Sequence, residues 1–162
     1  MTEVIIIEEN TYQQIEIEII ETEEEEPFDP AMITQEYYVS TRDEIQRFIE
    51  ELNEIIRRRN FNAWVAALSP EYFEFLSSAE HLEQVSESPA MTTRRLVLRT
   101  IEEYFMHVVV PSRANSRVDD IEFISMDRVQ AFSINTIRTG EEVQKLRLYD
   151  LEKISDSWKI IN

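Results

Sequence analysis

Residues 120–162 read DIEFISMDRVQAFSINTIRTGEEVQKLRLYDLEKISDSWKIIN and contain four runs rich in β-branched and aromatic residues. The runs cover residues 120–126, 127–138, 143–154 and 157–162, and runs of this composition favour β-strands. The connectors are short. One of them holds Gly140, which is the only glycine in the chain, and another offers the side-chain oxygens of residues 155–157 for a local turn. We therefore predict a meander of antiparallel strands joined by hairpins.

The bulk composition predicts one domain and excludes several classes of function. A chain of 162 residues can bury a core of its own. A net charge of −17 argues against nucleic acid and anionic membranes as partners, because both need a surplus of cations on the protein. No cysteine is present, and two histidines, His81 and His107, are too few for a histidine-rich metal site. We expect neither a metal nor a cofactor.

The negative charge is concentrated near the N-terminus. Residues 1–41 hold twelve acidic residues and no basic one, whereas the remainder holds 21 acidic and 16 basic residues. Isoleucine and glutamate alternate over residues 3–9 and 12–20, which predicts strands, and residues 21–36 are predicted to be a linker. The division expected is an acidic extension at 1–36 and a domain at 37–162. The glutamate run within the linker is interpreted as a solvated spacer, with a lid that docks on arginines as the alternative.

Targeting signals give only a default location. No apolar run reaches membrane-spanning length, so no membrane insertion is expected, and Met-Thr-Glu lacks the positive start of a signal peptide. A cytoplasmic protein is therefore expected. An exported protein whose signal segment had been replaced by a new methionine would look the same.

The first half of the chain is predicted to be helical. Ser40 and Thr41, followed by acids three residues later, are capping-box signals that open a helix with an apolar stripe from Ile45 to Ile56. Arginines at 57–59 fit its C-terminus, although they could also bind phosphate. A second helix is expected from Phe61 to Leu68, ended by Ser69 and Pro70.

Three further segments precede the strands. Residues 71–76, EYFEFL, fit either a short strand or a continuing turn. Ser77 with Glu80 predicts a short helix over the following turns. Thr92 or Thr93 is expected to cap a long helix that Pro111 closes, although the valines at 108–110 favour extended backbone.

This order of elements, ending in LYDLEKISDSWKIIN, resembles the nuclear transport factor two-like (SnoaL-like, cystatin-like) superfamily over residues 41–162. The terminal hairpin pattern of that superfamily is matched by Arg147, Tyr149, Leu151, Lys153, Trp158, Lys159 and Ile160. Trp64 with Leu-Ser-Pro resembles its opening helices, whereas its usual last-turn glycine is replaced by Asp156 or Ser157. The resemblance implies an α+β fold in which a strongly curved antiparallel sheet wraps over three to four helices. It also implies a pocket between the concave face and the long helix.

The second strand predicts that both faces of the sheet need cover. One face would carry Val129 and Ala131, and the other Phe132 and Ile134. Exposed apolar surface costs roughly 25 cal/mol per Å², and helices can cover only the concave side. We therefore expect the convex side to pack on a second subunit, giving a homodimer, or on the isoleucine-rich N-terminal strands.

Two kinds of site are possible in such a pocket. An isomerase or dehydratase needs a general base and an oxyanion donor, and Tyr104 with His107 is the best pair, with Asp119, Asp120 and Tyr149 as partners. Both side chains also have structural explanations, as a core aromatic and a cation near a helix end. A binding pocket would instead be lined by aromatic and tyrosine side chains, namely Trp64, Tyr72, Phe75, Tyr104 and Tyr149. These residues could equally fill the pocket.

Charged residues near the strands add one more candidate. Arg113 and Arg117 could close on an anionic ligand, or form salt bridges with nearby acids. Adjacent acids on a strand point to opposite faces, so Asp119 and Asp120 do not predict a metal site. The leading hypothesis is a noncatalytic domain that binds a small apolar molecule or a protein partner. The alternatives are the Tyr104 and His107 enzyme and a structural dimerisation module with a filled cavity.

Overall fold

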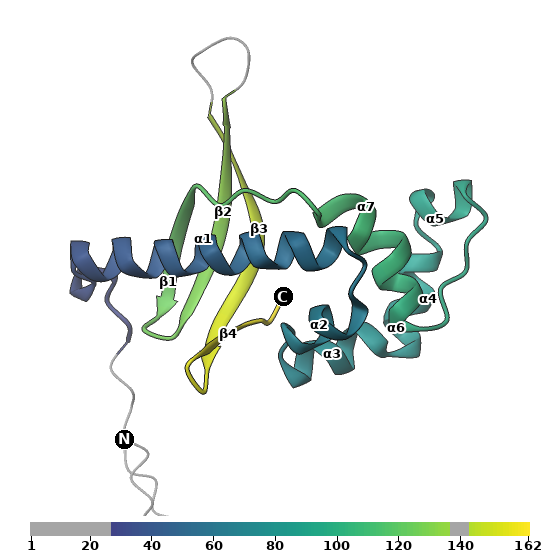
Figure 1. Cartoon of the computed structure of the whole chain (residues 1–162), viewed down its shortest axis with the longest axis horizontal. Coiled ribbons are helices and arrows are strands. Elements are labelled where there is room, and N and C mark those ends of the chain that lie inside the picture. The colour runs from purple at the N-terminus through teal and green to yellow at the C-terminus, as the bar shows by residue number, and fades with distance from the viewer. Residues whose placement is uncertain (1–26, 137–142) are drawn as a thin grey trace, which may run out of the picture.

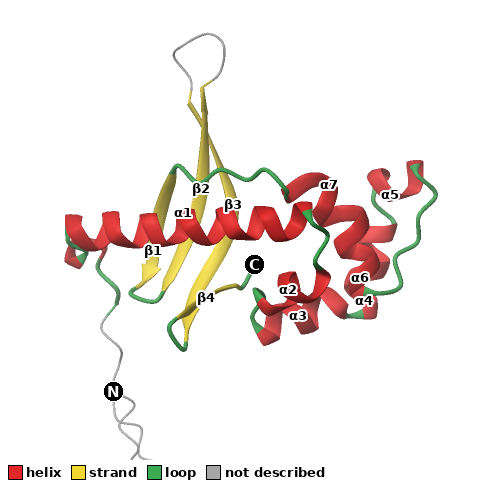
Figure 2. Ribbon diagram, in the orientation of Figure 1, coloured by secondary structure: helices red, strands yellow, loops and turns green. Residues whose placement is uncertain are grey.

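The computed structural model describes residues 27–136 and 143–162, which form an α+β fold (Figures 1 and 2). The helical elements come first: η1 (Pro30–Met32), α1 (Gln35–Arg57), α2 (Phe61–Ala66), α3 (Pro70–Ser77), α4 (Ala79–Ser86), α5 (Pro89–Thr93), α6 (Ile101–Tyr104), the π-helical turn η2 (Phe105–Val109) and α7 (Val110–Arg113). The strands follow: β1 (Asp120–Ser125), β2 (Arg128–Thr136), β3 (Val143–Ile154) and β4 (Ser157–Ile160).

The strands form one curved, open sheet in the order β1-β2-β3-β4 with antiparallel neighbours, which confirms the predicted meander. The hairpin between β3 and β4 has a two-residue loop, Ser155 and Asp156, with φ values of 51° and 64°. Positive φ at both positions is the pattern of a type I′ turn, whose twist matches that of the strands. The chain therefore makes this turn without the glycine that the resemblance implies.

Helix α1 runs across the concave face of the sheet (Figure 1). Its buried stripe, Ile45, Ile49, Leu52 and Ile56, belongs to the same core cluster as Val129 and Leu151 of the sheet. This confirms the predicted helical stripe. The remaining helices gather at one end of the sheet, where they close the core.

The start of α1 corrects the prediction at Ser40 and Thr41. The helix begins at Gln35, because Thr34 accepts a hydrogen bond from the Tyr37 backbone N–H at 3.1 Å. Thr41 is instead buried inside the helix on the side of Ile45. Several Ser and Thr residues in succession offer equivalent local caps, and only packing selects among them.

Polar side chains of α1 hold the connection that leads from α7 into β1. The Arg57 guanidinium donates to the carbonyl oxygen of Ala114 at 2.9 Å, and the Gln46 amide donates to that of Val118, also at 2.9 Å. Between them, the buried Asn53 side chain exchanges two hydrogen bonds with the Ser116 backbone. One face of α1 thus fixes this connection.

Residues 71–76 resolve as helix α3. Ser69 accepts a hydrogen bond from the Tyr72 N–H at 3.1 Å, and Pro70 occupies the first turn, where its missing N–H costs nothing. Helix α4 is then capped by Ser78, whose hydroxyl accepts from the His81 N–H at 3.2 Å. The predicted cap at Ser77 was therefore wrong by one residue.

The long helix predicted from Thr92 or Thr93 is divided. Helix α5 ends at Thr93, and Arg95 has a φ of 55°, which is incompatible with a continuing right-handed helix. The chain re-enters a helix only after Thr100, which caps α6 by accepting from the Glu103 N–H at 3.1 Å. Because a Thr with Glu three residues later is a capping box, the signal was present at Thr100 and was missed.

Pro111 lies inside this helix rather than closing it, and the valines at 108–110 are helical. The π-helical turn η2 precedes Pro111, and the Val110 N–H donates to the Phe105 carbonyl, five residues back. A proline withholds the N–H that would bond the carbonyl four residues earlier. That carbonyl, His107 O, accepts from Arg94 Nη1 at 3.0 Å instead. The α6–η2–α7 helix is therefore continuous despite the proline.

The segment between α2 and α3 extends the sheet beyond β4. Leu68 and Ile160 form a parallel bridge, in which the Ser69 N–H donates to Ile160 O at 2.9 Å and the Ile160 N–H donates to Ala67 O at 2.8 Å. The outer edge of β4 is thereby paired.

On the convex face, charged side chains lie over the apolar ones. Lys145 Nζ lies 4.3 Å from the centre of the Phe132 ring and forms ion pairs with Asp120 at 3.0 Å and Glu122 at 2.6 Å.

The predicted strands at 3–20 and the connector at 139–142 lie outside the described residues. Within the described ranges, no helix combines the length and apolar character needed to cross a membrane.

Candidate ligand-binding pocket

A cavity of about 290 Å³ lies where the helical end of the molecule meets the sheet. Its walls come from α2, α3, the α6–η2–α7 helix, β3 and the end of β4. Aromatic side chains form much of the wall, namely Trp64, Tyr72, Tyr104 and Tyr149. Polar groups at the same cavity are Ser112, Arg113, Arg147 and Asn162.

A β-bulge shapes the sheet side of the cavity. Ala131 pairs with Tyr149 and the next residue, Phe132, pairs with Arg147, so Leu148 has no partner on β2. In a regular strand, successive side chains point to opposite faces. The extra residue breaks this alternation, and as a result Arg147, Leu148 and Tyr149 all line the cavity.

The π-helical turn shapes the opposite wall. It adds one residue to the turn between Tyr104 and Val110, so that Val108 and Val109 both reach the cavity, followed by Ser112 and Arg113. Turns of this kind are rare and occur frequently at functional sites. The bulge at Leu148 and the π-helical turn therefore meet at the same cavity.

The aromatic wall is anchored in the core. Trp64 is buried, with its ring centroid 4.9 Å from that of Phe105 and 6.5 Å from that of Tyr104. The Trp64 ring is therefore packed against the core on the side away from the cavity, and Trp64 and Tyr104 line the cavity without filling it.

Four of the five predicted ligand-binding residues, Trp64, Tyr72, Tyr104 and Tyr149, line this cavity, and Phe75 does not. Phe75 is 56% exposed, and its ring is tilted against that of His81, with centroids 4.7 Å apart. On the other side it stacks beside Tyr72, with centroids 6.3 Å apart, so Phe75 lies behind the cavity wall and not in it. The aromatic residues of α3 indicated the right type of lining residue. They did not indicate which of the rings faces the cavity.

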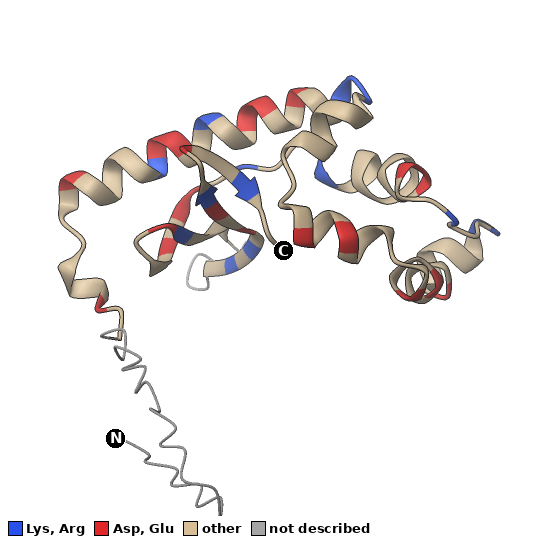
Figure 3. Cartoon of the chain, turned by 90° about the horizontal axis from the view of Figure 1, so that it is seen from below, with Lys and Arg blue, Asp and Glu red and all other residues tan. Residues whose placement is uncertain are grey.

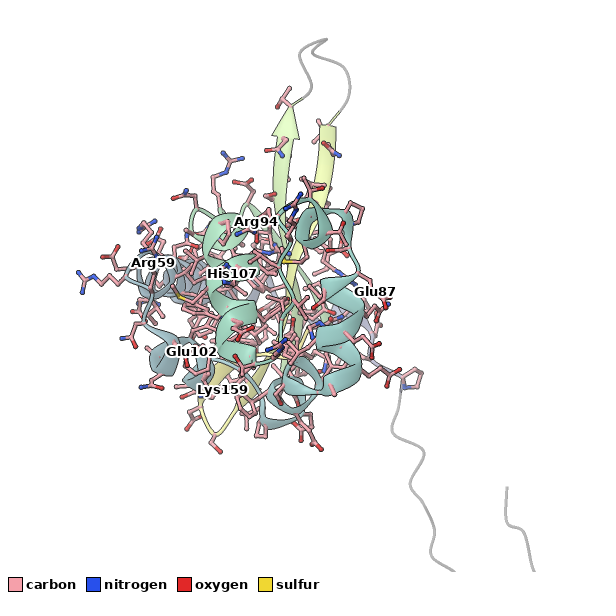
Figure 4. All side chains as sticks on the ribbon, turned by 90° about the vertical axis from the view of Figure 1, so that its right-hand side faces the viewer. Arg59, Glu87, Arg94, Glu102, His107 and Lys159 are labelled. Carbon is pink, nitrogen blue, oxygen red and sulfur yellow. The ribbon has the colours of Figure 1, made fainter. Side chains whose placement is uncertain are left out.

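The predicted catalytic pair is separated. Tyr104 lines the cavity, whereas His107 is absent from its walls and lies beside Arg94, with 3.4 Å between Arg94 Nη2 and His107 Nδ1. Figure 4 shows Arg94 and His107 at the helical end of the molecule. The π turn changes the rotation between positions 104 and 107, so a spacing of three no longer places the two side chains on one face.

The predicted acidic partners also lie elsewhere. Asp119 accepts from Arg117 Nε at 2.9 Å and from the Ile134 N–H at 2.7 Å. Asp120 accepts from the Tyr38 hydroxyl and from Lys145. Neither residue lines the cavity. In the ranges that the structure covers, no three acidic or histidine side chains are placed to hold a metal ion.

The three tyrosines of the cavity stay protonated at neutral pH. Burial raises the pKa of Tyr72 to about 12, and burial also raises the pKa of Tyr104 and of Tyr149. The cation of Arg113 lowers all three values in opposition to burial. The cavity therefore presents neutral hydroxyl groups close to one guanidinium, and these groups can bind a ligand but do not supply a general base.

Sequence reasoning missed Ser112, Arg147 and Asn162 as cavity residues. Ser112 follows Pro111, whose place inside a helix is visible only in the fold. Arg147 belongs to the terminal hairpin pattern, but the bulge that turns it toward the cavity leaves no signature in a sequence without Gly or Pro at that point. The chain end brings Asn162 to the cavity through the pairing of β4.

The chain is similar to a protein of Treponema pallidum (strain Nichols) that is named an uncharacterized lipoprotein. The two are 34% identical over 134 residues, which cover 83% of this chain and 67% of that protein. The chain belongs to the same family as this lipoprotein. No protein-family model matches the chain, and no solved structure does. The resemblance to the nuclear transport factor two-like superfamily therefore stays a prediction.

Proposed function

We propose that this protein is a noncatalytic binding domain that takes a small molecule with an apolar body into the cavity between α3, the α6–η2–α7 helix and β3. The observation that carries the proposal is an unfilled cavity of about 290 Å³ whose wall contains four aromatic side chains together with polar ones. Ligand pockets are concave, largely pre-formed and lined by such rings with a few polar groups. The buried contacts of Trp64 with Phe105 support a pre-formed wall.

The position of His107 favours binding over catalysis. An enzyme of the isomerase type needs a base and a donor at the same reacting atoms, and His107 contacts Arg94 rather than the cavity. The tyrosines there have raised pKa values, so they remain donors. A dimerisation module with a filled core is disfavoured by the open volume.

The test is binding of N-phenyl-1-naphthylamine, a neutral apolar probe that fluoresces in apolar sites. The full chain should bind it, and Ser112→Trp, which places an indole in the cavity from an exposed helix position, should weaken binding at least about tenfold. His107→Leu is the matched control and should bind within about twofold of wild type. Equal binding by wild type and Ser112→Trp, or no binding by wild type, would refute the proposal.

Native mass spectrometry of freshly purified protein adds a second readout. A co-purified small molecule would appear as extra mass that Ser112→Trp abolishes. The same spectrum gives the subunit number and so tests the predicted homodimer. Removal of residues 1–36 then tests the expectation that the convex face is covered by a second subunit or by the N-terminal strands. A stable, soluble monomer without that segment would contradict both possibilities.

We also propose that the protein works outside the cytoplasm, in place of the cytoplasmic default. The support is its family membership with a protein that is named a lipoprotein. Residues 1–162 contain no cysteine for a lipid to modify, so the measurement uses the chromosomal gene product in its own cells. Fractionation should place the protein with the cell envelope, and recovery with cytoplasmic markers would refute this location.

A further inference from the structure

Three arginines surround the cavity and the hollow beside it, and they differ in their partners. Arg117 makes a bidentate contact with Asp119, with Nε and Nη2 each 2.9 Å from a carboxylate oxygen. Arg147 lies 3.8 Å from the Asp150 carboxylate. Within the described ranges, Arg113 has no carboxylate partner. The chain has a net charge of −17. Even so, the charge of Arg113 at the cavity is not paired with an acidic side chain of the described residues, and it can interact with a ligand.

Arg113 is held over the cavity by an aromatic ring. Its guanidinium carbon lies 5.2 Å from the centroid of the Tyr149 ring, within the range of a cation–π interaction. The residue is half-buried. A partly desolvated cation interacts more strongly with an anion than an exposed one does, because less water screens the pair.

Arg113 shares the cavity wall with three tyrosines, Tyr72, Tyr104 and Tyr149, which come from α3, α6 and β3. The Arg113 charge lowers the pKa of each of them in opposition to burial. Neutral tyrosine hydroxyls can donate hydrogen bonds. A guanidinium on the same wall as hydroxyl-bearing rings is suited to a carboxylate, whose two oxygens only accept.

The surrounding surface makes this arrangement selective. Acidic residues are spread along α1 and over α3 and α4 (Figure 3), whereas two arginines and no acidic side chain line the cavity. Arg113, Ser112 and Leu148 also line an adjoining hollow of about 330 Å³. Arg113 thus stands on the wall that the two hollows share.

We propose that the cavity selects small carboxylates with an aromatic or similarly flat apolar body, and that Arg113 is the residue that determines this selectivity. The apolar body lies against Trp64 and Tyr104, and the carboxylate contacts Arg113. This inference rests on the proposed binding function, and it adds the charge class of the ligand.

The test compares 1-naphthylacetate with 1-naphthylacetamide, which have the same apolar body and differ in charge. Each competes with N-phenyl-1-naphthylamine for the full-length chain. The acid should compete about tenfold or more better than the amide, because hydrogen bonds to charged groups are the stronger ones. Arg113→Gln should abolish this preference, whereas Arg113→Lys should retain part of it.

Arg58→Gln is the control for charge alone. It removes one positive charge from an exposed position that does not line the cavity, and it should leave the acid preference unchanged. Thermal unfolding of Arg113→Gln tests the alternative that Arg113 only balances the C-terminal end of α7. A lowered midpoint with an unchanged acid preference would overturn the proposal.

The outcomes separate the two proposals. If the neutral probe binds but the acid and the amide compete equally, the binding function stands and the carboxylate inference fails. If the neutral probe does not bind to wild type, both fail together. A preference for the acid that survives in Arg113→Gln assigns the selectivity to another residue and also contradicts the inference.

Discussion

Asn53 and Ser116 exchange two hydrogen bonds: Asn53 Nδ2 donates to the Ser116 carbonyl at 2.7 Å, and the Ser116 N–H donates to Asn53 Oδ1 at 3.2 Å. This pair joins the C-terminal part of α1 to the connection that follows Arg113. Because the Asn53 side chain is buried, it satisfies two backbone groups that water does not reach freely. The position of one cavity wall therefore depends on α1.

Asn53→Ala should destabilise the protein by about 2 kcal/mol, the usual cost of leaving buried backbone groups without partners. Urea unfolding followed by circular dichroism measures the change. Asn62→Ala, at an exposed position of α2, is the matched control and should change the free energy of unfolding by less than about 0.5 kcal/mol. Equal effects of the two substitutions would show that the Ser116 pair contributes nothing.

Asp119 should make stability depend on pH in the acid range. The hydrogen bond from Arg117 and that from the Ile134 N–H lower the pKa of Asp119. Its contribution is therefore fully present above the unfolded pKa of about 4 and is lost as the pH falls through the folded value. The difference in unfolding free energy between wild type and Asp119→Asn should be largest above pH 5 and shrink toward pH 3.

Asp127→Asn provides the comparison for Asp119, since Asp127 is exposed and lies in a turn. Its difference from wild type should vary little over the same range. A pH-independent difference for Asp119→Asn would contradict the predicted linkage.

Tyr72 should make stability depend on pH in the alkaline range. Burial raises its pKa to about 12, above the ordinary value of 10. The folded state thus favours the protonated hydroxyl, so this contribution is complete below pH 10 and is lost as the pH rises through 12. Tyr72→Phe should lose less stability between pH 10 and 12 than wild type.

The hairpin between β3 and β4 offers a stabilising change. Ser155 and Asp156 occupy positive φ, which non-glycine residues adopt at a cost, and Asn-Gly is the preferred pair for this turn. The double substitution Ser155→Asn and Asp156→Gly should raise the unfolding free energy by about 1 kcal/mol. Asp127→Gly, at a turn position without positive φ, should not stabilise. A loss of stability in the double variant would contradict the turn assignment.

The sheet and α1 could be predicted because their signals are local and strong. The runs within residues 120–160 have high β-propensity, and Ile45 to Ile56 follow the helical period. Helix starts were less secure, because Thr34, Ser40 and Thr41 carry similar capping chemistry. The choice among them depends on which side chains the core buries, as the burial of Thr41 illustrates.

Only part of the site could be predicted, and the reason is related. Aromatic identity indicated Trp64, Tyr72, Tyr104 and Tyr149. Whether Phe75 faces the cavity depends on how the regular helix α3 packs, whereas the direction of His107 depends on irregular backbone. The irregular features at the cavity are the π turn before Pro111 and the bulge at Leu148. Neither follows from a period of 3.6 or 2, and so neither can be extracted from spacing alone.

The bridge between Leu68 and Ile160 has a consequence for self-association. A sheet that grows between molecules needs a free edge on each side of every copy, and residues 67–69 occupy the edge of β4. Within the described residues, β4 pairs only with residues 151–154 of β3, and residues 143–148 of β3 have no strand beside them on the side away from β2. Another copy could therefore extend the sheet along β1 or along this protruding part of β3. Pairing between the sheets of two copies is thus directed away from β4 and toward these two edges.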